Sequence, residues 1–308
     1  MTRHQFVQLD VFTREPLTGN PLAVFPDATG LDPVTMQRLA REMNLSETTF
    51  VTPSPLATRR VRFFTPAAEI PLAGHPTIGT WWLLAESGAI PLQPSGVTHV
   101  TQETGAGVLP VDIYSQNGKV TRVVMTQAEP QFEDPVTGGA KLAKALGGGA
   151  GLLAKQPPPQ VVSTALPQLM VPIKSLSLLK ALPSGGTGMA LAKLLEEMGT
   201  QCAMCYTQET ERPEATVHCR MFAPGFGVPE DPATGSAAGA LGAYLVWHGL
   251  VRPHDGVARI VVEQGLEIGR PSIIHVEVAV GNGGEITAVQ VGGEAVTVIT
   301  GEVTLSPR

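Results

Sequence analysis

The chain repeats one motif at two places, and this repeat limits its fold more than any other feature. Near Arg62 the sequence reads RFFTP and then EIPLAGH, and near Arg220 it reads RMFAP and then EDPATGS. The order Arg, Phe, Pro, Glu, Pro, Gly is the same in both copies, apart from a short insertion in the second. A unit of this length is too long for a solenoid repeat and indicates a duplicated domain.

Each copy of the motif leads into an apolar stretch of small residues that predicts a buried helix. In the first copy the stretch covers residues 75–87, where Pro76 suits the first turn and Gly88 follows the end. In the second copy it covers residues 235–248 and is followed by Gly249. Strand-like segments surround both helices, so the sequence predicts an α+β fold of two similar lobes, each with many strands wrapped around one apolar helix.

The two helix N-termini are the first candidates for a ligand site. Unpaired backbone N–H groups and the partial positive charge at a helix N-terminus suit a carboxylate. Two similar lobes that face each other across a cleft are also a familiar way to form a small-molecule site. The duplication therefore indicates an enzyme that binds a small molecule between its lobes.

The rest of the chain divides between the two lobes. The acidic, proline-containing segment QAEPQFEDP is the expected linker, which places the N-terminal lobe at 1–127 and the C-terminal lobe at 128–297. The C-terminal strand, 298–308, is able to complete the N-terminal lobe. Further helices are expected near 33–43, 140–146, 174–181 and 188–198.

Composition and charge exclude several classes of protein. A chain of 308 residues is long enough for two domains with separate cores, and 43% hydrophobic with 16% charged residues is typical of a globular protein. The net charge is −6 and there is no Lys/Arg cluster, which disfavours a nucleic-acid or anionic-membrane partner. The sequence shows neither the apolar run of a signal peptide nor that of a membrane span, and three cysteines give no disulfide framework. We expect a cytoplasmic protein.

Four residues near the repeated motifs are candidates for chemistry. Glu47 lies in NLSETTF, where a carboxylate in an apolar setting can exchange protons near neutral pH; a structural Glu at a strand start is the alternative. His75 and Ser236 each follow the glycine at the start of their helix, although a buried structural role is the alternative for the histidine. Asp231 stands where the first copy has Ile70, which makes the expected cleft asymmetric unless Asp231 is only a capping carboxylate.

Other polar residues are assigned to structure. Glu69 and Glu230 occur in both copies, and a residue that both lobes need is expected to hold the shared turn. Cys202 and Cys205 form a Cys-x-x-Cys pattern in an expected strand, where side chains three apart point to opposite faces. Even with His218 nearby, core cysteines are the better interpretation, and no metal site is predicted.

The chain resembles the phenazine-biosynthesis PhzF-like family in several long motifs. They occur in collinear order from about residue 5 to residue 304 and read LTGNPLAVF, NLSETTFV, RFFTPAAEIPLAGHPTIGT, VSTALPQLMVP, EDPATGSAAGAL and EQGLEIGRPS. The resemblance implies the diaminopimelate-epimerase-like fold, in which two pseudo-symmetric lobes each form a β-barrel around a central helix. It also implies an active site between the lobes, and relatives of this kind are commonly homodimers.

The resemblance further implies a reaction and its residues. PhzF-like enzymes isomerise trans-2,3-dihydro-3-hydroxyanthranilate, a small anionic cyclic acid. They use the Glu of the NLSET motif, which is Glu47 here, to take a proton from C3 and return one to C1. Since His75 and Ser236 replace the acid–base cysteines of the related racemases, a two-thiol mechanism is not expected, and no metal or other cofactor is required. The substrate-binding residues implied by the resemblance are Ser46, Gly74, His75, Asp231, Gly235 and Ser236.

Two alternatives stay open. An epimerase or racemase of another small amino or hydroxy acid would share the fold. A non-catalytic binding protein would keep the fold without using Glu47 for proton transfer. The intact NLSETTF motif favours an enzyme, because a binding protein has no need of that carboxylate.

Overall fold

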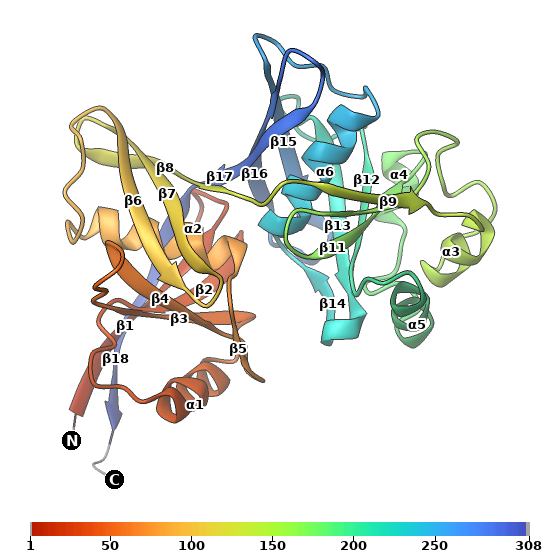
Figure 1. Cartoon of the computed structure of the whole chain (residues 1–308). Coiled ribbons are helices and arrows are strands. Elements are labelled where there is room, and N and C mark those ends of the chain that lie inside the picture. The colour runs from red at the N-terminus through yellow and green to blue at the C-terminus, as the bar shows by residue number, and fades with distance from the viewer. Residues whose placement is uncertain (1, 306–308) are drawn as a thin grey trace. The chain divides into compact units, whose positions relative to one another are not determined.

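The computed structural model describes residues 2–305, and the contacts among them divide the chain into two compact units. Unit 1 combines the chain up to Met125 with the stretch from Gly292 onward, and unit 2 is Thr126–Val291. The sequence analysis expects lobe boundaries at 127/128 and 297/298. Figure 1 shows that each unit consists of strands around a central helix, with further helices outside the strands.

The described part of unit 1 contains nine strands and two α-helices. Its helices are α1 (Pro33–Met43) and α2 (Gly74–Glu86). Its strands are β1 (Thr2–Val11), β2 (Asn20–Phe25), β3 (Glu47–Thr52), β4 (Arg59–Phe64), β5 (Glu69–Ile70), β6 (Gly96–Thr104), β7 (Gly107–Gln116), β8 (Lys119–Thr126) and β18 (Ala295–Leu305).

Unit 2 contains the remaining strands and four α-helices. Its helices are α3 (Gly139–Ala145), α4 (Leu176–Lys180), α5 (Met189–Glu197) and α6 (Gly235–Trp247). Its strands are β9 (Gln131–Pro135), β10 (Gln160–Ser163), β11 (Pro167–Pro172), β12 (Ala203–Thr207), β13 (Val217–Ala223), β14 (Val228–Asp231), β15 (Val257–Gln264), β16 (Ser272–Val280) and β17 (Ile286–Gly293), the last of which continues into unit 1.

Strand pairing follows the same order in both units. In unit 1, β1–β2 is antiparallel, β2–β3 parallel, β3–β4 antiparallel and β4–β6 parallel. In unit 2, β10–β11, β11–β12, β12–β13 and β13–β15 repeat that series. The register repeats as well, because Phe50 lies opposite Arg62 and Cys205 lies opposite Arg220. The duplicated motif therefore marks a duplicated sheet, and the predicted α+β fold is confirmed.

The strands of unit 1 form a closed ring. Beyond β6 the antiparallel pairs β6–β7 and β7–β8 continue the sheet, and β8 pairs with β17. Strand β17 runs into β18 with only Glu294 between them, and β18 pairs antiparallel with β1. Because a closed sheet has no free edge, this arrangement gives unit 1 the barrel that the family resemblance implies.

Each unit holds one apolar helix at its centre, as the sequence predicts. In α2 every residue from His75 to Ala85 is buried, and the helix contacts β1, β2, β3, β7 and β18. In α6 the buried residues run from Gly235 to Leu245 with Ser236 half-buried, and the helix contacts β10, β11, β15 and β16. A helix that is apolar on all sides is stable only when surrounded, which is the role the strands take here.

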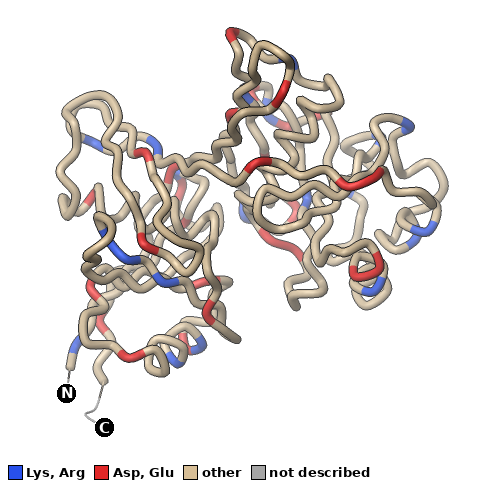
Figure 2. The backbone as a smooth tube through the Cα atoms, viewed as in Figure 1, with Lys and Arg blue, Asp and Glu red and all other residues tan. Residues whose placement is uncertain are grey.

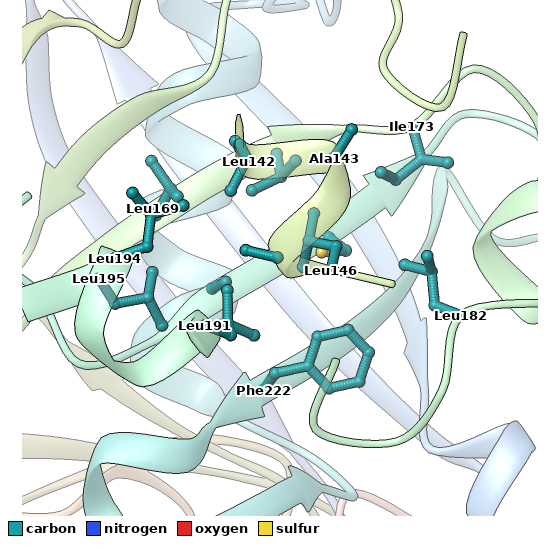
Figure 3. Close-up of a cluster of buried hydrophobic side chains, with 14 of the residues drawn as sticks. Leu142, Ala143, Leu146, Leu169, Ile173, Leu182, Leu191, Leu194, Leu195 and Phe222 are labelled. Atoms are coloured by element: carbon teal, nitrogen blue, oxygen red, sulfur yellow. The ribbon is translucent and has the colours of Figure 1, made fainter. Parts of the chain in front are cut away.

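A second layer of helices covers the outer face of each sheet. In unit 1, α1 begins at the capping residue Asp32, whose carboxylate accepts from two backbone N–H groups, and packs on a core that contains Phe25, Phe50 and Phe64. In unit 2, α3, α4 and α5 take the corresponding place over a core that contains Phe222 (Figure 3). Phe222 stands two residues after Arg220 as Phe64 stands two after Arg62, so the duplicated motif supplies an aromatic side chain to both cores.

The duplicated arginine and glutamate form an ion pair in both units. Arg62 donates to both carboxylate oxygens of Glu69 at 2.7 Å, and Arg220 donates to those of Glu230 at 2.8 and 2.6 Å. Each guanidinium also lies over the ring of the phenylalanine two residues on, 5.2 and 5.1 Å from the ring centre. The two glutamates therefore hold the turn before each central helix, as the sequence analysis expects.

Charges are interspersed over both units. Figure 2 shows basic and acidic positions scattered over both units, in keeping with a net charge of −6. Within residues 2–305, none of the helices has the length and apolar character that crossing a membrane requires.

Candidate active site

Glu47 and His75 lie together at the start of the central helix of unit 1. Glu47 is the first residue of β3, directly opposite Leu22 of the parallel strand β2. His75 is the second residue of α2, and its Nε2 lies 3.5 Å from Glu47 Oε2. Their side chains are 19% and 8% exposed, respectively, so this polar pair is largely shielded from water. Ser46 precedes the carboxylate, and its Oγ donates to Asn20 Oδ1 at 3.4 Å.

Burial decides the charge of His75. Although a carboxylate lies within ion-pair distance, burial lowers the pKa of His75 to about 3. The imidazole is therefore neutral at neutral pH and has one N–H to donate and one nitrogen to accept. A neutral histidine beside Glu47 can orient the carboxylate or a ligand without holding a fixed positive charge.

The first turn of α2 keeps its backbone donors available. Its N-cap residue is Ala73, and no side chain among residues 2–305 caps this end. Pro76 has no N–H, so the amides of Gly74 and His75 are the donors that a ligand would meet. The aligned peptide dipoles add a partial positive charge at this point. The structure thus places an anion-binding helix start beside the Glu47 carboxylate.

A buried chain of hydrogen bonds fixes this helix start. Thr77 Oγ1 donates to Ala73 O at 2.8 Å and accepts from Gln102 Nε2 at 3.3 Å. The Trp81 indole donates to Gln102 Oε1 at 3.0 Å. Because Gln102 is fully buried on β6, the strand and the helix cannot shift independently without losing these bonds.

In unit 2 the same turn carries Asp231 and Ser236 in place of Ile70 and His75. Asp231 ends β14, and its carboxylate accepts from the hydroxyl of Thr234, the N-cap residue of α6. Gly235 and Ser236 open the helix, and the described part of the chain provides no side-chain cap here either. The structure therefore brings together Asp231, Gly235 and Ser236 in unit 2, and Ser46, Glu47, Gly74 and His75 in unit 1.

Two glutamines, the half-buried Gln127 and the buried Gln168, support the start of α6, and the sequence analysis does not identify them. Gln127 Nε2 donates to Gly235 O at 3.0 Å, and Gln168 Nε2 lies 3.5 Å from Ser236 Oγ. Since the amide donates to that oxygen, the hydroxyl hydrogen of Ser236 can be donated to a ligand. Gln168 is fully buried in the otherwise apolar strand QLMV, and such a polar residue at a core position is the signal that could have revealed it.

The cysteines take no part in either helix start. Cys202, Cys205 and Cys219 are buried and form no disulfide, which confirms the expectation of core cysteines. Burial raises the pKa of Cys202 to about 12 and also raises the pKa of the other two thiols. Thiols of this kind are poor proton carriers at neutral pH. Across the described residues, no group of three or more His, Cys, Asp or Glu side chains is arranged to hold a metal ion.

These features define what each half can do. Unit 1 combines a carboxylate, a neutral imidazole and uncapped backbone donors, which together suit proton transfer on an anionic substrate. Unit 2 combines a carboxylate, a hydroxyl and uncapped backbone donors, which suit hydrogen bonding to polar groups.

Known proteins are similar to this chain over nearly its whole length. Residues 9–301 match the family described as phenazine biosynthesis-like protein. A trans-2,3-dihydro-3-hydroxyanthranilate isomerase of Pseudomonas fluorescens is 36% identical over 304 residues, which cover 98% of this chain and 100% of the relative. An uncharacterized isomerase of Clostridium acetobutylicum is 38% identical over 309 residues, 99% of either chain. A crystal structure of a Bacillus anthracis phenazine biosynthesis protein of the PhzF family superimposes with a TM-score of 0.90 at 31% identity, covering 99% of this chain and 100% of that one.

Proposed function

The chain belongs to the family of phenazine biosynthesis-like proteins, and we propose that it is an isomerase that moves a proton and double bonds in a small cyclic carboxylic acid. The relative from Pseudomonas fluorescens suggests the compound to try first, trans-2,3-dihydro-3-hydroxyanthranilate. The isomerase named in Clostridium acetobutylicum has no stated substrate, so the class of reaction is proposed ahead of the individual compound.

One contact supports this function above all others. His75 Nε2 lies 3.5 Å from Glu47 Oε2 beside the uncapped start of α2. A carboxylate that takes a proton from carbon must be held at a fixed place and shielded from water. The neutral neighbour His75 meets the first condition, and the 19% exposure of the Glu47 side chain meets the second. The backbone donors of the helix start lie next to it, where they suit the carboxylate of the substrate.

The proposed mechanism uses one carrier. Glu47 takes the proton from C3 of the ring, the double bonds shift, and the same carboxyl returns a proton to C1 to give an enol that becomes a ketone. Neutral His75 orients the carboxylate, while Asp231 and Ser236 bind polar groups of the substrate. The proton taken from C3 and the proton given to C1 both move between carbon and Glu47. In the last step the enol oxygen loses its proton as a ring carbon gains one, so the sequence is balanced without an oxidant, a reductant or a cofactor.

The test is proton NMR of trans-2,3-dihydro-3-hydroxyanthranilate in heavy water with the purified protein. We expect deuterium to enter the ring as the double bonds move, and we expect Glu47→Gln to lower the rate by about 100-fold to 10,000-fold, the usual contribution of a general base. Glu42→Gln is the matched control, because Glu42 is exposed on α1 of the same unit. Unchanged turnover in Glu47→Gln would overturn the assignment of the base.

A wild-type protein that leaves this compound unchanged would redirect the search. Exchange of an α-proton on another small amino or hydroxy acid would then support an epimerase. Binding without any exchange would support a non-catalytic protein of the same fold.

A further inference from the structure

His218 lies at the centre of a buried charge network in unit 2 that the proposed mechanism does not use. It stands on β13, where its Nδ1 lies 2.7 Å from Glu263 Oε1 on β15 and its Nε2 lies 2.8 Å from Glu267 Oε1. The side chains of His218 and Glu263 are fully buried, and that of Glu267 is 9% exposed. Glu267 belongs to the short 3-10 helix η2 (Leu266–Ile268).

The geometry favours a protonated ring, because its two nitrogens face two different carboxylates. A neutral imidazole carries one N–H, whereas both nitrogens of His218 face carboxylate oxygens at hydrogen-bond distance. Burial opposes protonation, but the hydrogen bonds to Glu267 and Glu263 outweigh it and raise the pKa of His218 above its ordinary value. Burial likewise opposes ionisation of Glu267, but the bond from His218 and its charge lower the pKa of that carboxyl.

The other charges around the network have partners of their own. On β13, Arg220 is paired with Glu230 of β14, and its Nε lies 4.0 Å from Glu267 Oε2. From the preceding loop, the backbone N–H groups of Glu211 and Arg212 donate to the two oxygens of Glu263 at 2.6 and 3.0 Å, and the Glu211 side chain pairs with Lys180 at the end of α4. Cys219, the neighbour of His218, is a protonated buried thiol. His218 is therefore the cation that joins Glu263 to Glu267.

Glu263 and Glu267, the two carboxylates that His218 joins, lie on either side of Gln264 in the chain. Gln264 holds the turn that begins at Asp231. Gln264 follows Glu263 and donates to Asp231 O at 2.7 Å and to Thr234 Oγ1 at 3.1 Å. It also accepts from the Thr234 backbone N–H at 3.2 Å. Gly265, at φ +81°, lies so close to the turn that an added Cβ would be 2.5 Å from Pro232 O. The segment from Glu263 to Glu267 thus packs against the turn that begins at Asp231 and is hydrogen-bonded to it.

We propose that protonated His218 is a positioning residue for the candidate site: by binding Glu263 and Glu267 it fixes Gln264, and through Gln264 it fixes the turn that carries Asp231 and Ser236. Its effect on turnover rests on the proposed function, whereas its hold on the turn does not. The ring hydrogen-bonds to Glu263 and Glu267, neither of which is assigned to substrate binding, so it acts through the strand and η2.

Unit 1 has a different cation at the matching place. Arg60 lies opposite Glu103 in the β4–β6 register, as His218 lies opposite Glu263 in the β13–β15 register. The Arg60 pair spans 3.7 Å, and its side chains are 51% and 18% exposed. An arginine keeps its charge at every accessible pH, but a histidine can lose it. The turn of unit 2 is therefore the one whose order depends on pH.

The experiment is amide hydrogen exchange by NMR on the full chain, with a parallel titration of the His218 ring. The reporter is the Thr234 amide, which donates to Gln264. After correction for the intrinsic pH dependence of exchange, we expect its protection to fall about ten-fold or more as His218 loses its proton, since a hydrogen bond in a charged network is at stake. In His218→Gln, which carries no charge, we expect that reduced protection at every pH.

Val171→Ala is the control, because Val171 is fully buried in the core of the same unit and lies outside the network. We expect it to lower global stability while the Thr234 amide keeps its dependence on pH. Wild-type protection that stays constant through the His218 titration would overturn the inference, even if His218→Gln fails to fold. Equal Thr234 protection in wild type and His218→Gln would overturn it as well.

A second readout separates this inference from the proposed function. With trans-2,3-dihydro-3-hydroxyanthranilate as substrate, His218→Gln should raise KM more than it lowers kcat and should lose the decline in kcat/KM that follows deprotonation of His218. An unchanged KM and an unchanged pH profile would contradict a positioning role. If the wild type does not turn this compound over, the proposed function fails while the exchange measurement still decides the role of His218.

Discussion

The same arginine–glutamate pair occurs in both units but in different surroundings. Arg62 and Glu69 have side chains that are 18% and 43% exposed, whereas those of Arg220 and Glu230 are 3% and 2% exposed. Arg220 also donates to the backbone oxygens of Leu179 and Leu182 at the end of α4, at 3.2 and 2.5 Å. One duplicated pair therefore acts as a surface link in unit 1 and as a buried clamp under the extra helices of unit 2.

For the two helix starts the comparison is reversed: the backbone surroundings are alike and the side chains differ. Both begin after an N-cap residue without a side-chain cap among the described residues, and both are surrounded by strands in the same pairing order. Unit 1 adds Glu47 and His75, while unit 2 adds Asp231 and Ser236. The shared arginine–glutamate pair maintains the fold, and the shared glycines Gly74 and Gly235 open both helices. The side chains that differ between the copies are those proposed for function.

The largest expected difference between the units is the stability lost when the duplicated arginine–glutamate pair is broken. Arg220→Met leaves Glu230 buried without its partner, and we expect a loss of about 3–5 kcal/mol in the free energy of unfolding. Arg62→Met removes a more exposed pair, and the expected loss is about 0–1 kcal/mol. Urea unfolding followed by circular dichroism measures both. Equal losses would contradict the contrast in burial.

The central helices should respond alike to a smaller change. An added Cβ at Gly79 of α2 would lie 2.7 Å from side-chain carbons of Leu22 and Val11, and one at Gly242 of α6 would lie 2.6 Å from Val276. Because these contacts lie in a packed core, we expect Gly79→Ala and Gly242→Ala each to cost about 1–3 kcal/mol in thermal or urea unfolding. A variant as stable as the parent would show that its helix is not closely packed by the strands.

The two units should also differ in pH dependence, through His75 of unit 1. Its pKa of about 3 lies below the ordinary value of 6.5, so between these values the unfolded chain binds a proton that the folded chain does not. Folding therefore weakens as pH falls from 6.5 toward 3, by up to about 1.4 kcal/mol per pH unit.

His75→Asn should remove this share of the acid sensitivity, and Ser236→Ala, at the matching place in unit 2, should leave the slope unchanged. Unfolding free energies at a series of pH values test both. The same slope in His75→Asn and wild type would show that the ring is not held neutral.

Local patterns in the sequence were sufficient for much of this structure. Apolar stretches bounded by glycine predicted α2 and α6, and Asp32 before Pro33 predicted the cap of α1. The repeated glutamates were correctly expected to hold the turns, because a shared role requires a shared residue.

The rest depends on residues that are distant in the chain. The partners of His218 lie 45 and 49 residues further on, and they meet it only because β13 pairs with β15 and η2 follows β15. The side-chain amides of Gln127, Gln168 and Gln264 likewise contact the start of α6 across 30 to 108 residues. The hydrophobic periodicity of the sequence does not predict contacts between residues so far apart in the chain. The roles in binding and catalysis stay predictions for all the site residues, which are Ser46, Glu47, Gly74, His75, Asp231, Gly235 and Ser236.

The most direct measurement follows the transferred hydrogen itself. Substrate carrying deuterium at C3 is converted in ordinary water, and the early product is examined by NMR for deuterium at C1. If Glu47 alone carries the proton, part of the label should reach C1, the transfer should persist at a lower rate in Asp231→Asn, and turnover in Glu47→Gln should fall by about 100-fold to 10,000-fold. Product without label at C1, combined with equal loss of activity in Asp231→Asn and Glu47→Gln, would contradict a single carrier and indicate that both units exchange protons with the substrate.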